Sequence, residues 1–414
     1  GICYAPDTDV LTEEGWMPFP ELKKGVRIAT LNPRGEIEYQ MPTRYIEQEH
    51  SGPMYLFESV ALNLCTTPEH DLYVRSTSSK QYRLRPAKEC FGKQLVHLRT
   101  GTWHGEERAT FTVPGRPKTP GTKQREEFSL PREYPMDLFL EFFGYWLTEG
   151  STGSGVIHVA QTRDKHPAVY DKIMRCLQLL GYDHKPHDTV ISFGDVRLAA
   201  WLSQFGLSQD KYLPREFLEL SVRQLRILTE ALVDGDGGVY SNKDRAPGKP
   251  TCRNTLVLGE DKPKHQRQEL FTRSPRLAND YQELALKLGL CASVHTQTRE
   301  SGVDYIVRLS HQKEKYSLLD PRIKSRREEW VQYEGKVYCV EVPNHVIYVR
   351  RKGTPVWCGN CSRILPDAQM PHTKEGKVMD VLLNPVGVAA RMNLGTLYEA
   401  QLGKVAQKTG KPIK

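Results

Sequence analysis

The chain has 414 residues, of which 38% are hydrophobic and 26% charged, and its formal net charge is +8 with a pI near 8.9. This length is more than one hydrophobic core usually organises, and this composition excludes a wholly disordered chain, so we expect two or three folded units. The basic balance favours a polyanionic partner such as nucleic acid.

No stretch approaches the roughly 18 apolar residues that a membrane helix needs, and the first residues, "GICYAPDTDV", lack the charged and apolar regions of a signal peptide. We therefore expect a cytoplasmic protein with no membrane partner. The cysteines are odd in number, and the sequence does not contain two CxxC motifs. This pattern indicates free thiols rather than a disulfide framework or a zinc site. They lie at positions 3, 65, 90, 176, 252, 291, 339, 358 and 361.

Residues 3 to about 105 contain short runs rich in β-branched and aromatic residues, broken by Pro, Gly and Asn, which predicts mostly strands. Examples are "VRIATLN", "PMYLFESV" and "HDLYVRS". Residues 100–134 are polar and rich in Gly and Pro, which predicts a linker or an irregular surface insertion and hence a domain boundary.

From residue 136 the pattern changes to helical spacing and to an internal repeat. The segments "MDLFLEFFGYWLTEG" and "VRQLRILTEALVDGDGG" each have an apolar face that ends in an acidic residue and Gly. The segments "VYDKIMRCLQLLGYDHKPHDTVISFGD" and "DYQELALKLGLCASVHTQTRESGVDYIVRLS" each predict a helix closed by Leu-Gly and followed by strands. This self-similarity predicts a duplicated unit arranged about a pseudo-twofold axis.

From about residue 328 strands return. "EEWVQYEGKVYCVEV" predicts a hairpin about Glu334-Gly335, and "HVIYVRR" predicts a further strand. The β region is therefore expected to be interrupted by the helical pair. The segment after Cys361 is rich in turn residues and is expected to end as a helix.

The segment "VWCGNC" brings an asparagine and two cysteines, which are reactive side chains, to the end of the β region. The side-chain amide of Asn360 can attack its own main-chain carbonyl, which closes a succinimide and cuts the chain, and the thiol of Cys361 can receive an acyl group. Cys3, near the start, can attack the carbonyl of Ile2 and convert that peptide bond into a thioester. An isolated Asn-Cys pair is far more often an ordinary surface loop.

Four motifs in order change that interpretation: "CYAPDTDVLTEEGW", "TTPEH", "VYCVEVPNHVIYV" and "VWCGNC". With them, residues 3–360 resemble an intein, a self-splicing protein segment. The resemblance implies an all-β Hint splicing domain. It makes Cys3 the first nucleophile, Cys361 the second, and Asn360 the residue that cleaves.

The resemblance also assigns supporting roles. Thr67 and His70 match the Thr-x-x-His motif, in which the hydroxyl and main chain steady the oxyanion and the imidazole protonates the leaving nitrogen. His345 matches the histidine that assists asparagine cyclisation. Cys339 takes a place often held by Asp, where a titratable group coordinates the steps, with an inert buried thiol as the alternative.

The end of the segment departs from the family pattern. Gly359 replaces the common penultimate histidine, so cyclisation has to rely on His345, water or the main chain. The neighbouring Cys358 is either a catalytic group or, as we favour, a packing residue. Splicing needs no cofactor in this scheme, and it requires reduced thiols.

The repeated segments "FFGYWLTEG" and "TEALVDGDGG" resemble the paired motifs of LAGLIDADG homing endonucleases, which are α+β proteins with pseudo-twofold symmetry. The matching acids are Glu149 and Asp236. Two carboxylates at such an axis can hold magnesium ions and water beside the scissile phosphates. Lys211 in "DKYLP" matches a lysine that polarises phosphate or water, and a solvated surface lysine is the alternative.

This resemblance implies double-stranded DNA as a partner and a monomeric protein. Most basic contacts are expected to grip phosphate and a few to read bases. The candidates are Arg163, Lys165, Lys185, Arg253, Lys262, Lys264, Arg273 and Arg299.

Residues 361–414 resemble the RNA polymerase β subunit of bacteria or phages, through "ILPDAQMPHTKEGKVMDVLLNPVGVAARMNLG". The stretches "KEGKVMD" and "AARMN" differ from the sequences that this family usually has at these positions. The resemblance implies partners among the host polymerase subunits for this flank, which by itself is too short to polymerise RNA.

The expected organisation is therefore multidomain and discontinuous: flank 1–2, splicing domain 3–105, linker or DNA-contacting insertion 106–134, endonuclease 135–312, splicing domain 313–360, and flank 361–414. The expected function is excision of residues 3–360 with ligation of Ile2 to Cys361, combined with metal-dependent DNA cleavage. Two alternatives remain: a DNA endonuclease on a splicing-defective scaffold, and a polymerase-binding structural module.

Overall fold

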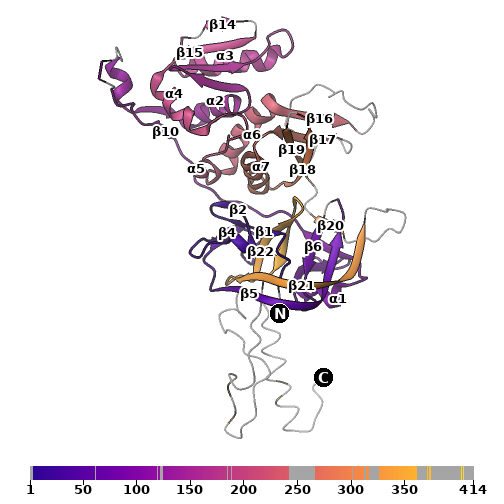
Figure 1. Cartoon of the computed structure of the whole chain (residues 1–414). Helices are drawn as coiled ribbons and strands as arrows, with labels where there is room; N and C mark the ends of the chain where they lie inside the picture. The colour runs from indigo at the N-terminus through magenta and orange to yellow at the C-terminus, as the bar shows by residue number, and fades with distance from the viewer. Residues whose placement is uncertain are drawn as a thin grey trace.

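The computed structural model describes residues 3–60, 62–118, 120–121, 125–183, 185–187, 189–241, 266–300, 302–311, 314–316 and 326–360, together with 371, 373, 402 and 404. These residues form two lobes (Figure 1), which we call the β lobe and the helical lobe. The predicted flanks at 1–2 and 361–414 lie outside the described residues, apart from those four single positions. Among the described residues no helix is long and apolar enough to cross a membrane.

The β lobe combines the two ends of the described chain. Its elements are β1 Thr8–Thr12, β2 Gly15–Pro18, the 3-10 turn η1 Phe19–Glu21, β3 Ile28–Leu31, β4 Ile37–Gln40, β5 Arg44–Glu58, β6 Asn63–Thr66, β7 Asp71–Ser76, β8 Arg83–Pro86, α1 Ala87–Cys90, β9 Leu95–Leu98, β20 Glu314–Tyr316, β21 Arg327–Glu341, β22 Val346–Arg351 and β23 Thr354–Gly359.

Three antiparallel sheets make up the β lobe, and each contains strands from both ends of the chain. The largest has the order β2-β1-β22-β3-β4, with β23 paired to β22. The others have the orders β20-β9-β7-β8 and β21-β5-β6. Because β20 to β23 follow the helical lobe in sequence, the interruption of the β region is observed directly in the strand pairing.

The predicted hairpin at Glu334-Gly335 is wrong. β21 is one strand of 15 residues that pairs along its whole length with β5, also of 15 residues. Gly335 (φ 146°) and Gly52 (φ 148°) lie near the middle of the two strands. At such φ values a residue without Cβ lets a long ribbon bend without ending, so the glycine that suggested a turn marks a bend instead.

The helical lobe is built from a repeated set of elements. They are β10 Thr110–Val113, η2 Glu126–Ser129, β11 Arg132–Pro135, α2 Met136–Glu149, β12 Gly150–Gly153, β13 Val156–Ala160, α3 Pro167–Leu179, β14 Lys185–His187, β15 Val190–Gly194, α4 Val196–Leu202, η3 Ser203–Phe205, α5 Arg215–Leu218, α6 Val222–Asp236, β16 Gly237–Ser241, β17 Gln266–Thr272, α7 Pro275–Lys287, β18 Cys291–Arg299 and β19 Gly302–Ser310.

The predicted duplication is visible in the topology of this lobe. One half runs α2-β12-β13-α3-β14-β15 and the other runs α6-β16-β17-α7-β18-β19. The two sheets have matching orders, β12-β13-β15-β14 and β16-β17-β19-β18. Each half therefore presents one four-stranded antiparallel sheet, entered from the end of its own long helix.

The segment predicted as a linker or insertion includes regular structure. β10 pairs with β11, and Phe111 on β10 packs against Phe139 of α2 with ring centroids 4.5 Å apart. The main chain at Glu106 bonds to Glu219 and Ser221 beside α5. Within the described part of 106–134, the chain is thus attached to the helical lobe.

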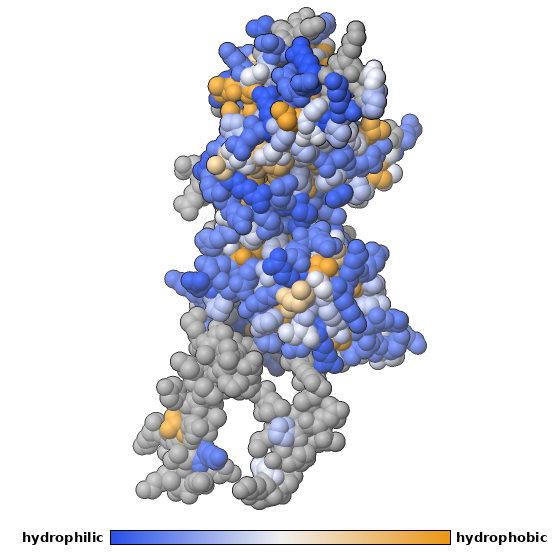
Figure 2. Space-filling model, turned by 90° about the vertical axis from the view of Figure 1, so that its left-hand side faces the viewer, coloured by the Kyte–Doolittle hydropathy of each residue, from blue (hydrophilic) through white to orange (hydrophobic). Residues whose placement is uncertain are grey.

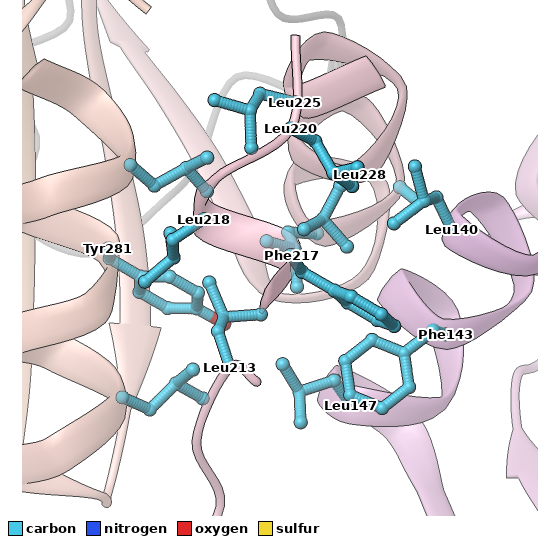
Figure 3. Close-up of a cluster of buried hydrophobic side chains, with 14 of the residues drawn as sticks. Leu140, Phe143, Leu147, Leu213, Phe217, Leu218, Leu220, Leu225, Leu228 and Tyr281 are labelled. Atoms are coloured by element: carbon cyan, nitrogen blue, oxygen red, sulfur yellow. The ribbon is translucent and has the colours of Figure 1, made fainter. Parts of the chain in front are cut away.

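A single apolar cluster fills the space between α2, α5, α6 and α7 (Figure 3). Phe143 of α2 and Phe217 of α5 lie edge to face with centroids 5.3 Å apart, and Leu228 of α6 and Tyr281 of α7 are also buried there. Burial of such side chains contributes about 1.5–3 kcal/mol each. This core holds the two halves in a fixed relation, so the C-terminal ends of α2 and α6 stay together.

Polar contacts join the two lobes. Arg215 of α5 donates from Nε to the carbonyl of Glu13 at 3.0 Å, and Tyr39 of β4 donates to Glu283 of α7 at 3.0 Å. Trp103 donates its indole N–H to the carbonyl of Leu220 at 3.0 Å. The face of both lobes seen in Figure 2 is mainly hydrophilic, as expected for a solvent-exposed surface.

Candidate functional site

Asn360 lies at the end of β23, buried beside the turn that precedes β22. Its main-chain N–H donates to the carbonyl of His345 at 3.1 Å, and its side-chain Nδ2 donates to the carbonyl of Val342 at 3.0 Å. Its Oδ1 is 3.2 Å from Nδ1 of His345. These three contacts hold the amide that the sequence resemblance predicts to be the cyclising group.

His345 adopts a left-handed backbone conformation, with φ 58°. Such a conformation is uncommon for a residue with a side chain and occurs where surrounding contacts hold it. Here the N–H of His345 donates to the carbonyl of Val342 at 3.0 Å, which closes the turn. The turn therefore presents both the imidazole and the carbonyl of His345 to Asn360.

Cys3 is fully buried, and Thr67 contacts both of its main-chain polar groups. The N–H of Cys3 donates to Oγ1 of Thr67 at 2.9 Å, and the N–H of Thr67 donates to the carbonyl of Cys3 at 2.9 Å. The Thr67 hydroxyl thus contacts the nitrogen that would leave Ile2. Gln48 of β5 approaches Sγ of Cys3 with its Nε2 at 3.5 Å.

His70 is also fully buried, three residues after Thr67, and its N–H donates to the carbonyl of Thr67 at 3.0 Å across a turn. The edge of its ring packs against Tyr4, with centroids 4.1 Å apart. Nε2 of His70 is 3.7 Å from Sγ of Cys358. Burial raises the pKa of the Cys358 thiol to about 12, so this thiol is neutral at physiological pH.

Cys339 lies on β21, 2% exposed, in the same apolar cluster as Cys3 and Cys358. Its Sγ is 3.4 Å from the carbonyl of Val340. The described cysteines are all free thiols, which agrees with the expectation from their spacing. Cys361 and Ile2, the other two residues of the predicted junctions, lie outside the described residues.

Gly359 has no room for a side chain. A Cβ at this position would lie 2.3 Å from the carbonyl oxygen of Asp71 and 2.8 Å from its Cβ. A penultimate histidine could not be accommodated here unless the main chain of β7 or β23 moved. The close contact between β23 and β7 therefore requires glycine at the position where the sequence resemblance leads one to expect histidine.

In the helical lobe, Glu149 and Asp236 are the last residues of α2 and α6. Lys211, which is 5% exposed, donates from Nζ to the carbonyl of Gly150 at 2.8 Å and to that of Trp146 at 3.3 Å. Nζ also lies 4.9 Å from the centre of the Trp146 ring. The three sequence-predicted residues of this site are therefore brought together.

The electrostatics of this site follow from burial. Burial raises the pKa of Asp236 to about 7, with a further increase from the charge of Glu149 and an opposing effect of Lys211. Burial also raises the pKa of Glu149, against the attraction of Lys211. Burial lowers the pKa of Lys211 to about 8, although both carboxylates oppose this.

This pair of acids fits a divalent cation. Two carboxylates that raise each other's free energy when ionised are stabilised by a shared or neighbouring positive charge, and Mg²⁺ binds through one or two carboxylates while it keeps several waters. Among the described residues no group of three or more His, Cys, Asp or Glu side chains is placed to hold a metal ion. The remaining ligands would then be water and substrate oxygens.

A cleft of about 360 Å³ opens next to Asp236 and Lys211. Arg273 of the β17 end and Arg299 of β18 lie along it, and both approach Asp304, at 3.6 and 2.9 Å. Exposed guanidinium groups beside half-buried carboxylates suit the contact of a phosphate next to a metal site.

The other predicted DNA-contacting residues do not line this cleft, as far as the structure describes them. Arg163 and Lys165 are exposed in the turn before α3, and Lys185 starts β14. Arg253, Lys262 and Lys264 lie outside the described residues.

The residues that sequence reasoning missed are Tyr4, Gln48 and Asp234. Tyr4 and Gln48 contact the predicted junctions at Gly359 and Cys3. Asp234 on α6 accepts from Lys172 at 2.6 Å and Tyr145 at 3.4 Å. The sequence offers one indication for Tyr4, which is its position next to Cys3 in the chain. The partners of all three are distant in sequence, so their contacts have no local pattern.

The C-terminal part of the chain is similar to known RNA polymerase sequences. Residues 358–414 match the family described as RNA polymerase Rpb2, domain 6. The DNA-directed RNA polymerase subunit beta of Myxococcus xanthus (strain DK1622) is 46% identical over 55 residues, which are 13% of this chain and 4% of that protein.

Two relatives match a much larger share of the chain. A DNA-directed RNA polymerase subunit beta C-terminal section of Stigeoclonium helveticum is 27% identical over 401 residues, 86% of this chain and 36% of that protein. An ATP-dependent Clp protease proteolytic subunit of Chlamydomonas moewusii is 26% identical over 317 residues, 73% of this chain and 29% of that protein. The chain spans about a third of the length of these two relatives.

Structural neighbours include the homing endonuclease I-DmoI. A structure of its mesophilic variants has a TM-score of 0.28 and 10% identity, covering 42% of this chain and 89% of that one. Its complex with DNA and Mn has a TM-score of 0.27 and 11% identity, covering 42% of this chain and 90% of that one.

Proposed function

We propose that this chain is a self-splicing precursor in which residues 3–360 excise themselves and join Ile2 to Cys361. The observation that carries the proposal is the meeting of the two ends of the segment. Tyr4, next to the first nucleophile, donates from its hydroxyl to the carbonyl of Gly359, next to the cleaving asparagine, at 2.5 Å. Residues 355 positions apart in the chain are thus neighbours on one β scaffold.

The proposed reaction needs no external reagent. The thiol of Cys3 attacks the Ile2 carbonyl, the Ile2–Cys3 amide bond breaks, and the thiol proton passes to the freed amine. The thiol of Cys361 then attacks this thioester and releases the thiol of Cys3. After Asn360 has cleaved the chain, the freed amine of Cys361 attacks the thioester on its own side chain, which forms the Ile2–Cys361 peptide bond and releases the thiol of Cys361.

The geometry at the first junction supports specific roles. The hydroxyl of Thr67, 2.9 Å from the nitrogen of Cys3, is positioned to hold the leaving nitrogen, and the N–H of Thr67 orients the neighbouring peptide. We assign protonation of this nitrogen to His70, as the motif implies. Burial of Cys3 excludes water, which would otherwise hydrolyse the thioester.

The sequence relatives support an inserted segment. A match that covers 73% of this chain cannot lie within residues 361–414 alone, so it includes much of 3–360. The two large-coverage relatives carry unrelated names, an RNA polymerase section and a Clp protease subunit. A segment shared by unrelated host proteins is what a mobile, self-removing element predicts. We assign residues 361–414 to an RNA polymerase β subunit as the host.

The splicing proposal is tested on the purified full chain under reducing conditions. Mass spectrometry should detect residues 3–360 as one product and residues 1–2 joined to 361–414 as the other. Asn360→Ala should block the C-terminal cut, and Cys3→Ala should block ligation. A wild-type chain that stays whole, with its thiols shown to be reduced, would contradict the proposal.

We propose a second activity for the helical lobe, metal-dependent cleavage of double-stranded DNA. Glu149 and Asp236 would hold Mg²⁺, which would supply positive charge to the scissile phosphate and an activated water. Lys211 would hold the phosphate or the water through Nζ, and Arg273 and Arg299 would grip the adjacent backbone. The raised pKa of Asp236 and its place beside an Arg-lined cleft support this assignment.

The second activity is tested with a library of random DNA duplexes. The library is incubated with the protein and Mg²⁺, and the newly formed DNA ends are then sequenced. Cleavage should be lost in Glu149→Gln and Asp236→Asn, while both variants should still splice. Cleavage that persists in both variants would reject these two acids. DNA cleavage by a wild-type chain that never splices would favour the alternative of an endonuclease on a splicing-defective scaffold.

A further inference from the structure

The hydroxyl of Tyr4 connects the two reactive junctions of the β lobe. It donates to the carbonyl oxygen of Gly359 at 2.5 Å, and both side chain and acceptor are buried. Tyr4 itself is fixed through its main chain, because its N–H donates to the carbonyl of Tyr338 at 2.8 Å and its carbonyl accepts from the N–H of Tyr338 at 3.0 Å. The donor is therefore presented from a rigid strand contact.

The acceptor belongs to the peptide group immediately before the cyclising residue. This Gly359–Asn360 peptide is held at both of its polar atoms, by Tyr4 at the oxygen and by the carbonyl of His345 at the nitrogen, 3.1 Å away. With this peptide plane fixed, the main-chain carbonyl of Asn360 can turn only about the N–Cα and Cα–C bonds of Asn360. The approach of its own Nδ2 is thereby restricted to a small set of angles.

Given the splicing function above, we propose that Tyr4 is a positioning residue for the cyclisation of Asn360. In that step Nδ2 of Asn360 forms a bond to the main-chain carbonyl carbon of Asn360, and the Asn360–Cys361 peptide bond breaks. Nδ2 loses a proton, and the departing α-amino group of Cys361 gains one. Tyr4 exchanges no proton, and it acts by holding the preceding peptide in the orientation that cyclisation requires.

The hydroxyl contributes separately from the ring of Tyr4. The ring stacks on Phe19 with centroids 5.2 Å apart and meets the edge of His70 at 4.1 Å. Tyr4→Phe keeps both ring contacts and removes the hydroxyl, which donates to Gly359 and also contacts the thiol of Cys358. The substitution therefore separates a role in cyclisation from a role in packing around the first junction.

The experiment measures the two junctions independently in the full chain. In a Cys3→Ala parent, release of residues 361–414 reports asparagine cyclisation alone. In an Asn360→Ala parent, loss of residues 1–2 on addition of dithiothreitol reports the thioester alone. Tyr4→Phe is expected to slow the first release about five- to tenfold and to leave the second rate within about twofold, since one neutral hydrogen bond is removed.

Tyr348→Phe is the matched control. The Tyr348 hydroxyl is also buried in the β lobe and also donates to a main-chain carbonyl, that of Arg99 at 2.9 Å, away from the junction. It should leave the ratio of the two rates unchanged. Equal rates for Tyr4→Phe and its parents, or equal slowing of both junctions, would overturn the assignment.

A spectroscopic measurement tests the contact without reference to the rates. Gly359-Asn360 is the single Gly-Asn pair in the sequence, so labelling glycine with ¹³C at the carbonyl and asparagine with ¹⁵N gives one carbonyl–nitrogen correlation. In uncleaved Cys3→Ala protein this carbonyl signal should move with Tyr4→Phe and stay with Tyr348→Phe. An unmoved signal in Tyr4→Phe would reject the contact.

The outcomes separate this inference from the splicing function. If the Cys3→Ala parent releases residues 361–414 and Tyr4→Phe does so equally fast, only the role of Tyr4 is rejected. If neither parent cleaves at its junction, the splicing function is rejected, and the role of Tyr4 is rejected with it.

Discussion

Single residues at the proposed C-terminal junction are constrained by contacts between β23 and β7. Gly359 is the residue that keeps these strands close, since a Cβ there would lie 2.3 Å from the carbonyl of Asp71. The position usually given to a catalytic histidine is thus occupied by close main-chain packing. Under the proposed function, cyclisation would depend on His345 and on the fixed peptide before Asn360.

Gly359→Ala is expected to slow asparagine cyclisation about tenfold or more. The added methyl group must displace main-chain atoms, and overpacking of this kind costs about 1–3 kcal/mol. The rate of release of residues 361–414 in a Cys3→Ala parent measures the effect. Gly194→Ala, where nothing lies within 4 Å of the added Cβ, is the control, and equal rates for the two variants would contradict the steric argument.

Magnesium binding at Asp236 should strengthen as the pH rises through about 7. The pKa of this half-buried carboxyl is raised to about 7, so below that pH protons compete with the metal and its apparent affinity falls about tenfold per pH unit. Lys211, with a pKa lowered to about 8, loses a repelling charge in the same direction. Thermal unfolding with and without Mg²⁺ should therefore show a larger stabilisation at pH 8 than at pH 6.

Without metal the sign of the pH effect is reversed. Because the folded pKa of Asp236 lies above its ordinary value near 4, this group supports the folded state at low pH, and that support is lost between about pH 4 and 7. Asp280, whose burial also raises its pKa to about 7, adds a similar dependence. Asp236→Asn retains Asp280 and should remove the Mg²⁺ effect, and a metal response that survives in this variant would place the ion elsewhere.

At the level of residues, sequence motifs named Thr67, His70, His345 and Asn360, and their contacts with the junctions now support the proposed roles. Motifs work for these residues because each is tied to a fixed spacing within a short segment. Tyr4 could not be assigned in that way, because its partner lies 355 residues away and only the folded β lobe brings the two together.

At the level of elements, the contact between α2 and α6 decides where the two acids lie. Gly144 of α2 faces Ala231 of α6 so closely that a Cβ on Gly144 would be 2.6 Å from that of Ala231. On α6, a Cβ on Gly235 would be 2.0 Å from Oγ1 of Thr148. Small residues at the crossing therefore allow the C-terminal ends of the helices to approach.

Gly144→Ala sets two effects of known size against each other. Alanine improves helix propensity by about 1 kcal/mol, whereas overpacking against Ala231 and the carbonyl of Leu228 costs about 1–3 kcal/mol. We expect a net loss of stability and of DNA cleavage. Adding Ala231→Gly restores the space and exchanges the two propensities, so the double variant should return close to the wild type in thermal unfolding.

Gly153→Ala, in open space on β12, provides the control for this helix pair. A double variant that is no more stable than Gly144→Ala alone would show that the crossing is not limited by these two side chains.

The elements themselves were predictable to different degrees. Periodic apolar patterns mark the helices α2 and α6 and the strands that follow each of them. Such patterns lie within short stretches of sequence, so these elements could be predicted. The Glu334-Gly335 turn was predicted wrongly because a glycine between two strand-like runs has the same local signature as a hairpin. The pairing of β21 with β5 along 15 residues on each strand was decided by a partner nearly 300 residues away.

At the level of the whole molecule, the two lobes share a buried ionic network. Glu283 of α7, with its side chain 1% exposed, contacts Arg215 at 2.7 Å and Lys287 at 3.0 Å and accepts from Tyr39 of the β lobe. Arg350 of β22 reaches α7 as well, donating to Asn279 at 2.7 Å. The hairpin that ends in Asn360 is therefore attached to the helical lobe.

Breaking this network should uncouple the lobes. Glu283→Gln removes the carboxylate that Arg215 and Lys287 share, so that the carboxylate left to Lys287 is that of Glu219 at 2.9 Å. Loss of one partner of a buried ion pair costs about 3–5 kcal/mol. Calorimetry should show one unfolding transition for the wild type and a lower, broader or split transition for the variant. Glu216→Gln, which removes an exposed ion pair with Arg108, should change the stability by less than about 1 kcal/mol.

The same network predicts the behaviour of the wild type in acid. Burial disfavours the ionised form of Glu283, but the charges of Lys287 and Arg215 outweigh it and lower the pKa to about 2. A carboxyl with a lowered pKa stabilises the fold above its ordinary value near 4, and this contribution is lost as the pH falls toward 2. The split expected for Glu283→Gln at neutral pH should therefore develop in the wild type between about pH 4 and 2. A wild-type transition that stays single and unshifted over that range would show that Glu283 does not couple the lobes.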